Sequence, residues 1–452
     1  MCVVTMCHHR PEVPFIISHN KMYYAICDCD NCYVSCERVF RPSLNGKPVV
    51  VLSNNDGCVV ARSNEAKRMG IKAGMPYFQL REQFAGADIA VFSSNYELYG
   101  ELTGRVMSLI RKASPRTFRY SIDESFCLLP DMSHDELKEW GEQLRKDVMQ
   151  GVGIPISIGI ARTKTLAKTA SHFAKKYSGY RHCCIIDTDE RRTKALQLYP
   201  IGEVWGIGRR YEARLTLAGI KTAYDFASQP RSWVKSEFNI VGTRTWMELN
   251  AIDCIPDEEI TRKKSICTSR SFTGMTTDFE TVRTHVVNFA ARCAEKLRRQ
   301  RSVASVVTVF LHTNAFRDDL PQYWNTREIT LLTPTNATQE IVKAAVDGLH
   351  HIFIEGYHYK KAGVVVMGIT SDRQIQTNFI DFDSERARKM AALGKVIDRL
   401  NRINGRDSII LSSQQYAQKG ADGKPVGFAD AIQHNFRSKN PTTRWNDIIY
   451  LL

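Results

Sequence analysis

The chain contains 452 residues, and its 62 Lys and Arg against 48 Asp and Glu give a formal net charge of +14 at pH 7. A positive surplus in a chain without a long apolar run favours a polyanion partner such as nucleic acid, although a solvated basic surface is the simpler alternative. No segment approaches the ~18 apolar residues of a membrane span, and the first 21 residues lack the apolar core of a signal peptide. We therefore expect about three domains of an intracellular protein without a membrane partner.

Strand-like and helical patterns alternate from Met22 to about Asp187 and predict an α/β core. The strands are expected at 22–26, 49–52, 89–92 and 156–160, and helices at 96–110 and 165–176.

Acidic residues accompany two of the strand-like runs in this core. Asp28 and Asp30 end the first run, and Asp123-Glu124 precede the apolar stretch at 126–129. Carboxylates at the ends of neighbouring strands can hold hard divalent cations. Two such ions can stabilise both the entering and the leaving oxygen of an in-line phosphoryl transfer. Most acidic pairs are solvated turn residues, however, so the surrounding sequence has to decide.

Thirteen cysteines occur in the chain and are expected to stay reduced in an intracellular protein. The run Cys27, Cys29, Cys32 and Cys36 invites a zinc interpretation. We do not favour it, because no second cluster of suitable spacing completes a tetrahedral site.

Two further regions indicate DNA binding. At 198–220, Gly206, Gly208, Arg209 and Arg210 with Leu215 and Gly219 resemble a helix-hairpin-helix, whose backbone amides can bind a DNA phosphate; a plain helical hairpin is the alternative. The region 262–301 carries ten Lys or Arg against three Asp or Glu, a local field that favours phosphate contacts. Its expected DNA-binding side chains are Arg262, Lys263, Lys264 and Arg270.

The order of elements from 268 to 369 predicts a split βαβ domain. Strands are expected at 268–272, 303–311, 327–332 and 363–369, and helices at 282–299 and 338–353. This βαββαβ order makes a four-stranded sheet with both helices on one face, which leaves the other face free for a duplex. A loose, polar tail is expected from about residue 373.

Several ordered motifs resemble the Y-family translesion DNA polymerases. They are Cys27-Asp28-x-Asp30-x-Cys32-Tyr33, Gly46-Lys47-Pro48-Val49-Val50-Val51, Ala61-Arg62-x-x-Glu65-Ala66-Lys67 and Tyr120-Ser121-Ile122-Asp123-Glu124-Ser125-Phe126. The stretches 51–58, 93–99 and 441–445 are similar to the branch that holds the catalytic subunits of bacterial DNA polymerase V. The resemblance runs from Met22 to Leu452, and residues 1–21, expected to be a disordered extension, lie outside it.

The resemblance implies an α/β (α+β) multidomain fold shaped as a right hand. Its palm would comprise 22–40 and 94–190, its small fingers 41–93, its helix-hairpin-helix thumb 191–256, its βαββαβ little finger 257–375 and its tail 376–452. Asp28, Asp123 and Glu124 would be catalytic and would hold two Mg²⁺ ions with the backbone carbonyl of Cys29; Asp30 would have a supporting role. The family would place the protein in the bacterial cytoplasm, associated with the nucleoid.

The same resemblance assigns the nucleotide pocket. Tyr33 stands at the steric-gate position, where its ring would exclude a ribose 2′-hydroxyl; a core tyrosine is the alternative. Lys67 and Lys175 match residues that grip the triphosphate, although Lys67 replaces an arginine common in other branches and loses bidentate contact. Asn64 stands where those branches have a phosphate-binding tyrosine. Val60 and Ala61 would form the roof over the nascent base pair, and such small residues favour bypass of damaged bases at the cost of fidelity.

Partners are implied mainly by the family. Primer–template DNA and deoxynucleoside triphosphates would be the substrates, in an error-prone translesion DNA polymerase of the SOS response. Gln376, Phe379 and Ile380 lie where the family carries a peptide for the sliding clamp, with the apolar order changed; an ordinary linker is the alternative. The terminal region resembles one specific to polymerase V-like proteins, and the resemblance implies the cleaved SOS accessory protein and the recombinase filament as partners.

Two other functions compete with this one. A nucleotidyl cyclase uses similar strands and carboxylates but has no use for a long DNA grip. A non-catalytic DNA-binding subunit of a repair complex would not need the acidic trio.

Overall fold

The computed structural model describes residues 22–114, 116–257, 263–377, 383–405, 407–414, 418–419, 425–427 and 434–448. The chain forms two compact units. Unit 1 comprises Met1–Glu259 and His434–Leu452, and unit 2 comprises Ile260–Gln433. Arg262, Phe379 and Ile380, for which roles were predicted, lie outside the described residues, as does the extension 1–21.

Unit 1 is built on a five-stranded sheet of order β5-β6-β1-β7-β8. The strands are β1 (Tyr23–Cys29), β5 (Arg116–Arg119), β6 (Glu124–Leu129), β7 (Ile156–Ala161) and β8 (Cys183–Ile186). The central strand β1 pairs antiparallel with both β6 and β7. The strands expected at 22–26 and 156–160 are therefore confirmed with slightly longer bounds.

Successive residues of β1 enter two different cores, because side chains alternate between the faces of a strand. Tyr23, Ala25 and Cys27 pack with helices α4 (Tyr96–Ala113) and α5 (His134–Val152). Tyr24 and Ile26 face helix α6 (Lys164–Lys176) and the helices that follow it. The sheet is thus covered on both faces, which fixes the end of β1 against its neighbours.

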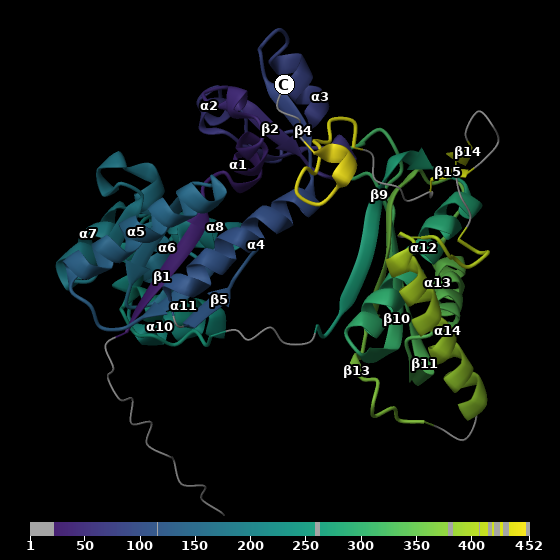
Figure 1. Ribbon diagram of the computed structural model, residues 1–452. Helices are drawn as coiled ribbons and strands as arrows, with labels where there is room; N and C mark the ends of the chain where they lie inside the picture. Colours follow the sequence, from purple (N-terminus) through teal and green to yellow (C-terminus); the bar gives the residue numbers. More distant parts are fainter. Residues whose placement is uncertain are drawn as a thin grey trace, which may run out of the picture. The chain divides into compact units, whose positions relative to one another are not determined.

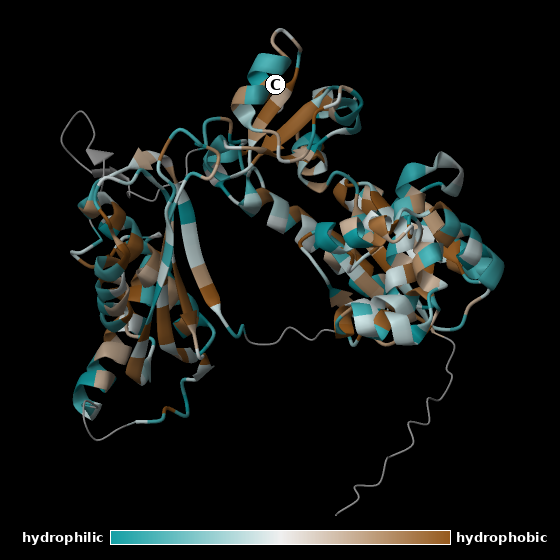
Figure 2. Cartoon of the chain, turned by 180° about the vertical axis from the view of Figure 1, so that it is seen from behind, coloured by the Kyte–Doolittle hydropathy of each residue, from teal (hydrophilic) through white to brown (hydrophobic). Residues whose placement is uncertain are grey.

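A smaller sheet of order β3-β2-β4 forms the second part of unit 1. Its strands are β2 (Val49–Leu52), β3 (Val59–Arg62) and β4 (Ala90–Ser93), which adjoin helices α1 (Cys32–Val39), α2 (Asn64–Arg68) and α3 (Tyr77–Gln83). All four residues of β2 are buried, and this apolar run is brown in Figure 2. The short helices pack by apolar side chains around it.

The helical part of unit 1 follows α7 (Asp189–Leu198) and includes α8 (Arg209–Leu217), α9 (Ala223–Ala227), α10 (Arg231–Glu237) and α11 (Ile240–Leu249). The predicted helix-hairpin-helix is only partly as expected. A short 3₁₀ turn at Ile201–Glu203 stands before the glycine turn, and α8 follows it. Gly206 has φ +95°, a conformation that glycine adopts without strain.

Unit 2 has the predicted βαββαβ order. Strands β9 (Ile266–Thr276), β10 (Ser302–Thr313), β11 (Trp324–Thr335) and β12 (Tyr359–Met367) form a sheet of order β11-β10-β12-β9. Helices α12 (Phe279–Arg299) and α13 (Thr338–Ile352) pack together on one face of the sheet (Figure 1). The fold class predicted from the sequence is therefore confirmed.

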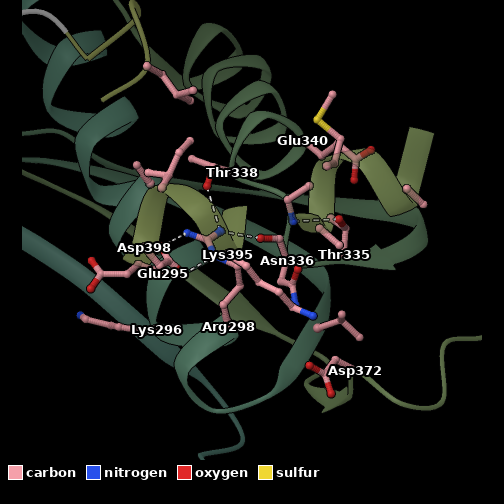
Figure 3. A pocket seen from close by; sticks show the side chains of 18 of the residues that line it. Glu295, Lys296, Arg298, Thr335, Asn336, Thr338, Glu340, Asp372, Lys395 and Asp398 are labelled. Atoms are coloured by element: carbon pink, nitrogen blue, oxygen red, sulfur yellow. Dashed lines mark hydrogen bonds and ion pairs between the residues drawn. The ribbon is translucent and has the colours of Figure 1, made fainter. Parts of the chain in front are cut away.

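The expectation of a loose tail is wrong for two segments. Residues Ser384–Ile403 form helix α14, which is fixed to unit 2 by a bidentate ion pair. Arg298 donates from Nε and Nη2 to the two carboxylate oxygens of Asp398, each at 2.7 Å, and from Nη1 to Asn336 O and Thr338 Oγ1 (Figure 3). No residue of α14 is buried, so its polar sequence gave little helical signal.

Residues 434–448 are the second ordered segment, and they belong to unit 1. They pack on β4 and the start of α4 through hydrogen bonds from Ser93 and Asn95. In the part of the chain that the structure describes, no helix is long and apolar enough to cross a membrane.

Candidate active site

The acidic residues predicted from the sequence meet at one edge of the five-stranded sheet. Asp28 of β1 lies directly opposite Glu124 of β6 in the antiparallel register. Asp123 immediately precedes Glu124, and its carbonyl accepts a hydrogen bond of 3.0 Å from the amide of Cys29. The sheet thus brings Asp28 close to Asp123 and Glu124, although Asp28 and Asp123 are 95 residues apart in the chain.

Each carboxylate has a polar partner. The ammonium Nζ of Lys175 lies 2.5 Å from Asp28 Oδ2, and Lys168 Nζ lies 2.7 Å from Glu124 Oε1. Ser121 Oγ donates to Asp123 Oδ1 at 2.5 Å. Among the described residues, no three His, Cys, Asp or Glu side chains converge as a metal-binding group. The carboxylates share one edge, but in these side-chain conformations they point to separate partners.

The electrostatics of this edge favour positive charge. Burial raises the pKa of Asp28 to about 7; Lys175 opposes the rise, and Glu124 and Asp123 add to it by repulsion. Burial lowers the pKa of Lys175, but the charge and hydrogen bond of Asp28 outweigh burial and leave that pKa raised. A buried carboxylate group of this kind is costly to ionise without a cation nearby.

Helix α6 carries both lysines, and its close packing on β7 places them. Lys168 and Lys175 are seven residues apart and therefore share one helix face. A Cβ on Gly159 of β7 would lie 2.1 Å from the carbonyl of Ala167 and from the amide of Ser171. Only glycine permits this approach. Lys168 was not predicted from the sequence, although its spacing from Lys175 was a usable signal.

Asp30 is tied to the sheet instead of to the acidic trio. Ser157 Oγ donates to Asp30 Oδ1 at 2.7 Å, and His182 Nδ1 lies 3.2 Å from Asp30 Oδ2. Neither Ser157 nor His182 was predicted, because they are remote in sequence and carry no motif. The supporting role expected for Asp30 stays a prediction.

The predicted phosphate-binding residues lie on two helices, Lys67 and Asn64 on α2 and Lys175 on α6. Lys67 Nζ donates to Asn31 Oδ1 at 2.6 Å and to Asn64 Oδ1 at 3.4 Å. Burial lowers the pKa of Lys67, and the positive charges of Arg62 and Lys175 lower it further. Lys67 and Lys175 therefore lie within electrostatic reach of each other. Asn64 accepts a hydrogen bond from Lys67 and so helps to orient it.

Tyr33, the predicted steric gate, belongs to an aromatic group at the start of α1. Its ring stacks on Tyr99 at a centroid distance of 4.7 Å and an interplanar angle of 15°. Tyr96 meets the same ring edge-on at 5.7 Å. Two neighbours thus restrict the orientation of the Tyr33 ring. The predicted roof residues Val60 and Ala61 lie on β3, where Val60 is 42 % exposed.

The predicted DNA-binding glycines and arginines surround the start of α8. Gly206, Gly208, Arg209 and Arg210 are all exposed. Gly208 is the N-cap of α8, and no side chain caps that helix end. Its first amides are thus available to an anion, which the positive end of the helix dipole also favours.

The basic residues predicted in unit 2 do not share one surface. Lys263 and Lys264 are exposed before β9. Arg270 lies opposite Ala362, a core residue beneath the helices, so its register places it on the helix-covered side. The DNA-binding role of Arg270 stays a prediction, but Arg270 does not lie on the face of the sheet that the helices leave free. That face instead carries Lys361, directly opposite His312, and neither was predicted.

Comparison with solved structures identifies the fold. A solved Y-family DNA polymerase chimera of Dbh and Dpo4 aligns with 77 % of this chain and 99 % of its own, with a TM-score of 0.62 and 20 % sequence identity. The chain therefore has the fold of the Y-family DNA polymerases.

Sequence comparison gives the particular family. Residues 27–172 match the impB/mucB/samB family, 263–379 its C-terminal domain, and 391–451 a domain of unknown function. Protein UmuC of Salmonella typhimurium is 39 % identical over 94 % of this chain and 99 % of its own length. Protein ImpB of the same species is 38 % identical over 94 % and 98 %. DNA polymerase IV 1 of Bacillus subtilis is 26 % identical over 89 % and 96 %. The chain belongs to the impB/mucB/samB family.

Proposed function

We propose that this protein is a DNA polymerase that extends primers opposite damaged template bases, as an error-prone enzyme of the SOS response. The observation that carries this proposal is the pairing of Asp28 with Glu124 at the sheet edge, next to Asp123. The Y-family fold and the relatives named UmuC and DNA polymerase IV support the same function.

The donor set at this edge fits Mg²⁺. Carboxylates are the hard oxygen ligands that this ion prefers, and it needs few of them because it keeps several waters. Asp28, Asp123, Glu124 and the backbone carbonyl of Cys29 would hold two ions. Asp28 already contacts the ammonium group of Lys175, and Asp123 already accepts a hydrogen bond from the hydroxyl of Ser121. Bound cations would take the place of these partners. Bound Mg²⁺ would lower the pKa of the primer 3′-hydroxyl and neutralise charge on the triphosphate.

The residues around the edge would orient the incoming nucleotide. Lys67 and Lys175 would bind the triphosphate as point charges, with Asn64 holding Lys67 in place. The Tyr33 ring would exclude a ribose 2′-hydroxyl by collision. The exposed Val60 and the small Ala61 would cover the nascent pair loosely, which tolerates damaged bases.

The DNA would be gripped at several points. The uncapped start of α8 with Gly206, Gly208, Arg209 and Arg210 would bind a backbone phosphate. Lys263, Lys264 and Arg262 would add non-specific phosphate contacts. A sliding clamp would bind Gln376, which is exposed, together with Phe379 and Ile380. The cleaved SOS accessory protein and the recombinase filament complete the proposed partners.

A primer-extension assay with Mg²⁺ tests this function. Wild-type protein is expected to extend a primer, and Asp123→Asn to lose at least about a hundredfold in rate, while both bind the DNA equally. Asp131→Asn, a change of another carboxylate on the same unit, is the matched control.

A non-catalytic DNA-binding subunit would give a different result. DNA binding without extension by wild-type protein, with clamp, accessory protein and recombinase filament present, would favour that alternative. Extension by Asp123→Asn at the wild-type rate would contradict the assigned site.

A further inference from the structure

The segment 434–448 is bound tightly to the smaller sheet of unit 1. Ser93 at the end of β4 donates its amide to Phe436 O at 3.0 Å, and Phe436 donates its own amide to Ser93 Oγ at 2.9 Å. The Phe436 ring meets Tyr77 edge-on at 5.5 Å. Phe436 is thus bound to the end of β4, although 343 residues separate it from Ser93.

A buried amide pair anchors the next part of the segment. Asn95 is 0 % exposed and donates from Nδ2 to Oδ1 of Asn440, which is 1 % exposed, at 2.5 Å. Arg437 and Arg444 both reach Glu97, at 3.1 Å and 2.8 Å. A hydrogen bond between two buried amides is costly to break, so this contact favours the docked position.

One hydroxyl of the docked segment donates a hydrogen bond to a buried carboxylate. Ser438 Oγ donates to Glu37 Oε1 at 2.9 Å, and the hydroxyl of Tyr99 donates to the same oxygen at 2.7 Å. Glu37 lies in α1 and is 2 % exposed. Removing either donor would leave a buried acceptor with part of its hydrogen bonding unmade, which is costly.

Tyr99 links this carboxylate to the proposed steric gate. Its hydroxyl is held by Glu37, and its ring is the face on which Tyr33 stacks at 4.7 Å. Tyr33 also shares α1 with Glu37, one turn away. The contacts therefore form a continuous path from Ser438 through Glu37 and Tyr99 to Tyr33.

We propose that residues 434–448 position the steric gate, with Ser438, Glu37 and Tyr99 as positioning residues that set how strictly the enzyme rejects ribonucleotides. This assignment rests on the proposed polymerase function and deepens it, because it gives part of the domain of unknown function at 391–451 a task at the nucleotide pocket. None of the three residues touches the reacting atoms. They act by fixing the plane of the Tyr99 ring, against which Tyr33 is held.

Single-turnover kinetics with matched deoxy- and ribonucleotides test the path. Ser438→Ala is expected to keep deoxynucleotide incorporation within about threefold while the preference over ribonucleotides falls about tenfold. Ser438→Thr, which keeps the hydroxyl, is expected to restore the preference. Arg444→Ala is the matched control, because it removes an exposed ion pair with Glu97 from the same segment and leaves the hydrogen bond from Ser438 to Glu37 in place.

A spectroscopic measurement keeps this test independent of activity. With 3-fluorotyrosine at position 33, the ¹⁹F resonance is expected to shift or broaden in Ser438→Ala and to remain unchanged in Arg444→Ala. An unchanged resonance and an unchanged sugar preference in Ser438→Ala would overturn the positioning role. Failure of the wild-type protein to extend a primer would overturn the polymerase function instead, and the resonance would still report on the path.

Discussion

The ammonium group of Lys175 lies 2.5 Å from a carboxylate oxygen of Asp28, across the boundary between helix α6 and the central strand. The contact joins a residue expected to bind triphosphate to a residue expected to bind metal. The positive charge of Lys175 offsets part of the repulsion among Asp28, Asp123 and Glu124, and in the proposed function the same charge would attract the triphosphate.

Replacing Lys175 should weaken nucleotide binding. We expect Lys175→Met to raise the Kd for deoxynucleotides by about 10- to 100-fold, because a charge-assisted contact contributes ~1.5–3 kcal/mol. Lys176→Met, which changes the adjacent lysine of the same helix, is the control. Pre-steady-state titration of the nucleotide measures both, and equal losses in the two variants would show a non-specific charge effect.

Removing the Tyr33 ring should relax sugar selection. Tyr33→Ala is expected to raise ribonucleotide incorporation by about 100-fold, since the proposed gate would exclude the 2′-hydroxyl by collision with the ring. Tyr33→Phe keeps the ring and should keep the selection. Competition between matched nucleotides measures the ratio. Unchanged selection in Tyr33→Ala would remove the gate assignment.

Replacing each of two glycines in the α8 turn by alanine should affect a different property, stability at one position and DNA binding at the other. A Cβ on Gly206, which has φ +95°, would lie 2.4 Å from Thr245 Oγ1, so Gly206→Ala should destabilise the fold by ~1–3 kcal/mol. A Cβ on Gly208 would meet no atom within 4 Å. Gly208→Ala should therefore leave stability unchanged but weaken DNA binding about tenfold, by holding a phosphate away from the amides. Urea unfolding and fluorescence anisotropy separate the two effects; full DNA affinity in Gly208→Ala would argue against phosphate binding here.

The elements predicted well were those with local signals. The buried apolar runs of β1 and β2 and the βαββαβ order of unit 2 follow from local sequence patterns. The acidic trio was predicted because Asp28 lies near the end of one strand-like run, Asp123 and Glu124 precede another, and all three belong to a family motif. Its pairing partner Lys168 was missed, since a lysine on a helix is usually solvated.

The docking of the C-terminal segment could not be predicted from the chain. The Asn95–Asn440 hydrogen bond joins residues 345 apart and has no periodic pattern. Helix α14 is similarly held by an ion pair between Arg298 and Asp398, 100 residues apart. Such contacts depend on tertiary geometry that polar composition does not reveal. The most specific family resemblance came from the stretches 51–58, 93–99 and 441–445. In the structure, Asp56, Asn95 and Arg444 of these stretches all take part in the contacts of the docked C-terminal segment.

The buried carboxylate Glu37 should make stability depend on pH. Burial raises its pKa above the usual 4.5, although hydrogen bonds from Tyr99 and Ser438 oppose the rise. The pKa of Glu37 is therefore higher in the folded protein than in the unfolded chain. Glu37 contributes its full stabilisation below about pH 4.5, and this contribution is lost as pH rises through the raised pKa. The stability of wild type relative to Glu37→Gln should therefore fall as pH increases over that window. Urea unfolding at several pH values measures the difference, with Glu97→Gln as the exposed control; a flat difference would contradict protonation of Glu37.

Finally, Gly159 should be irreplaceable because it lets α6 approach the sheet. The new Cβ in Gly159→Ala would lie 2.1 Å from two backbone atoms of α6, so the helix must move and stability should fall by ~3 kcal/mol or more. That movement would also carry Lys168 and Lys175 away from Glu124 and Asp28. Gly100→Ala is the matched control, since a Cβ there meets nothing within 4 Å and alanine favours the α4 helix by ~1 kcal/mol. Thermal unfolding and nucleotide titration should show both losses in Gly159→Ala and neither in Gly100→Ala; normal nucleotide affinity in a folded Gly159→Ala protein would show that the lysines do not depend on this close packing.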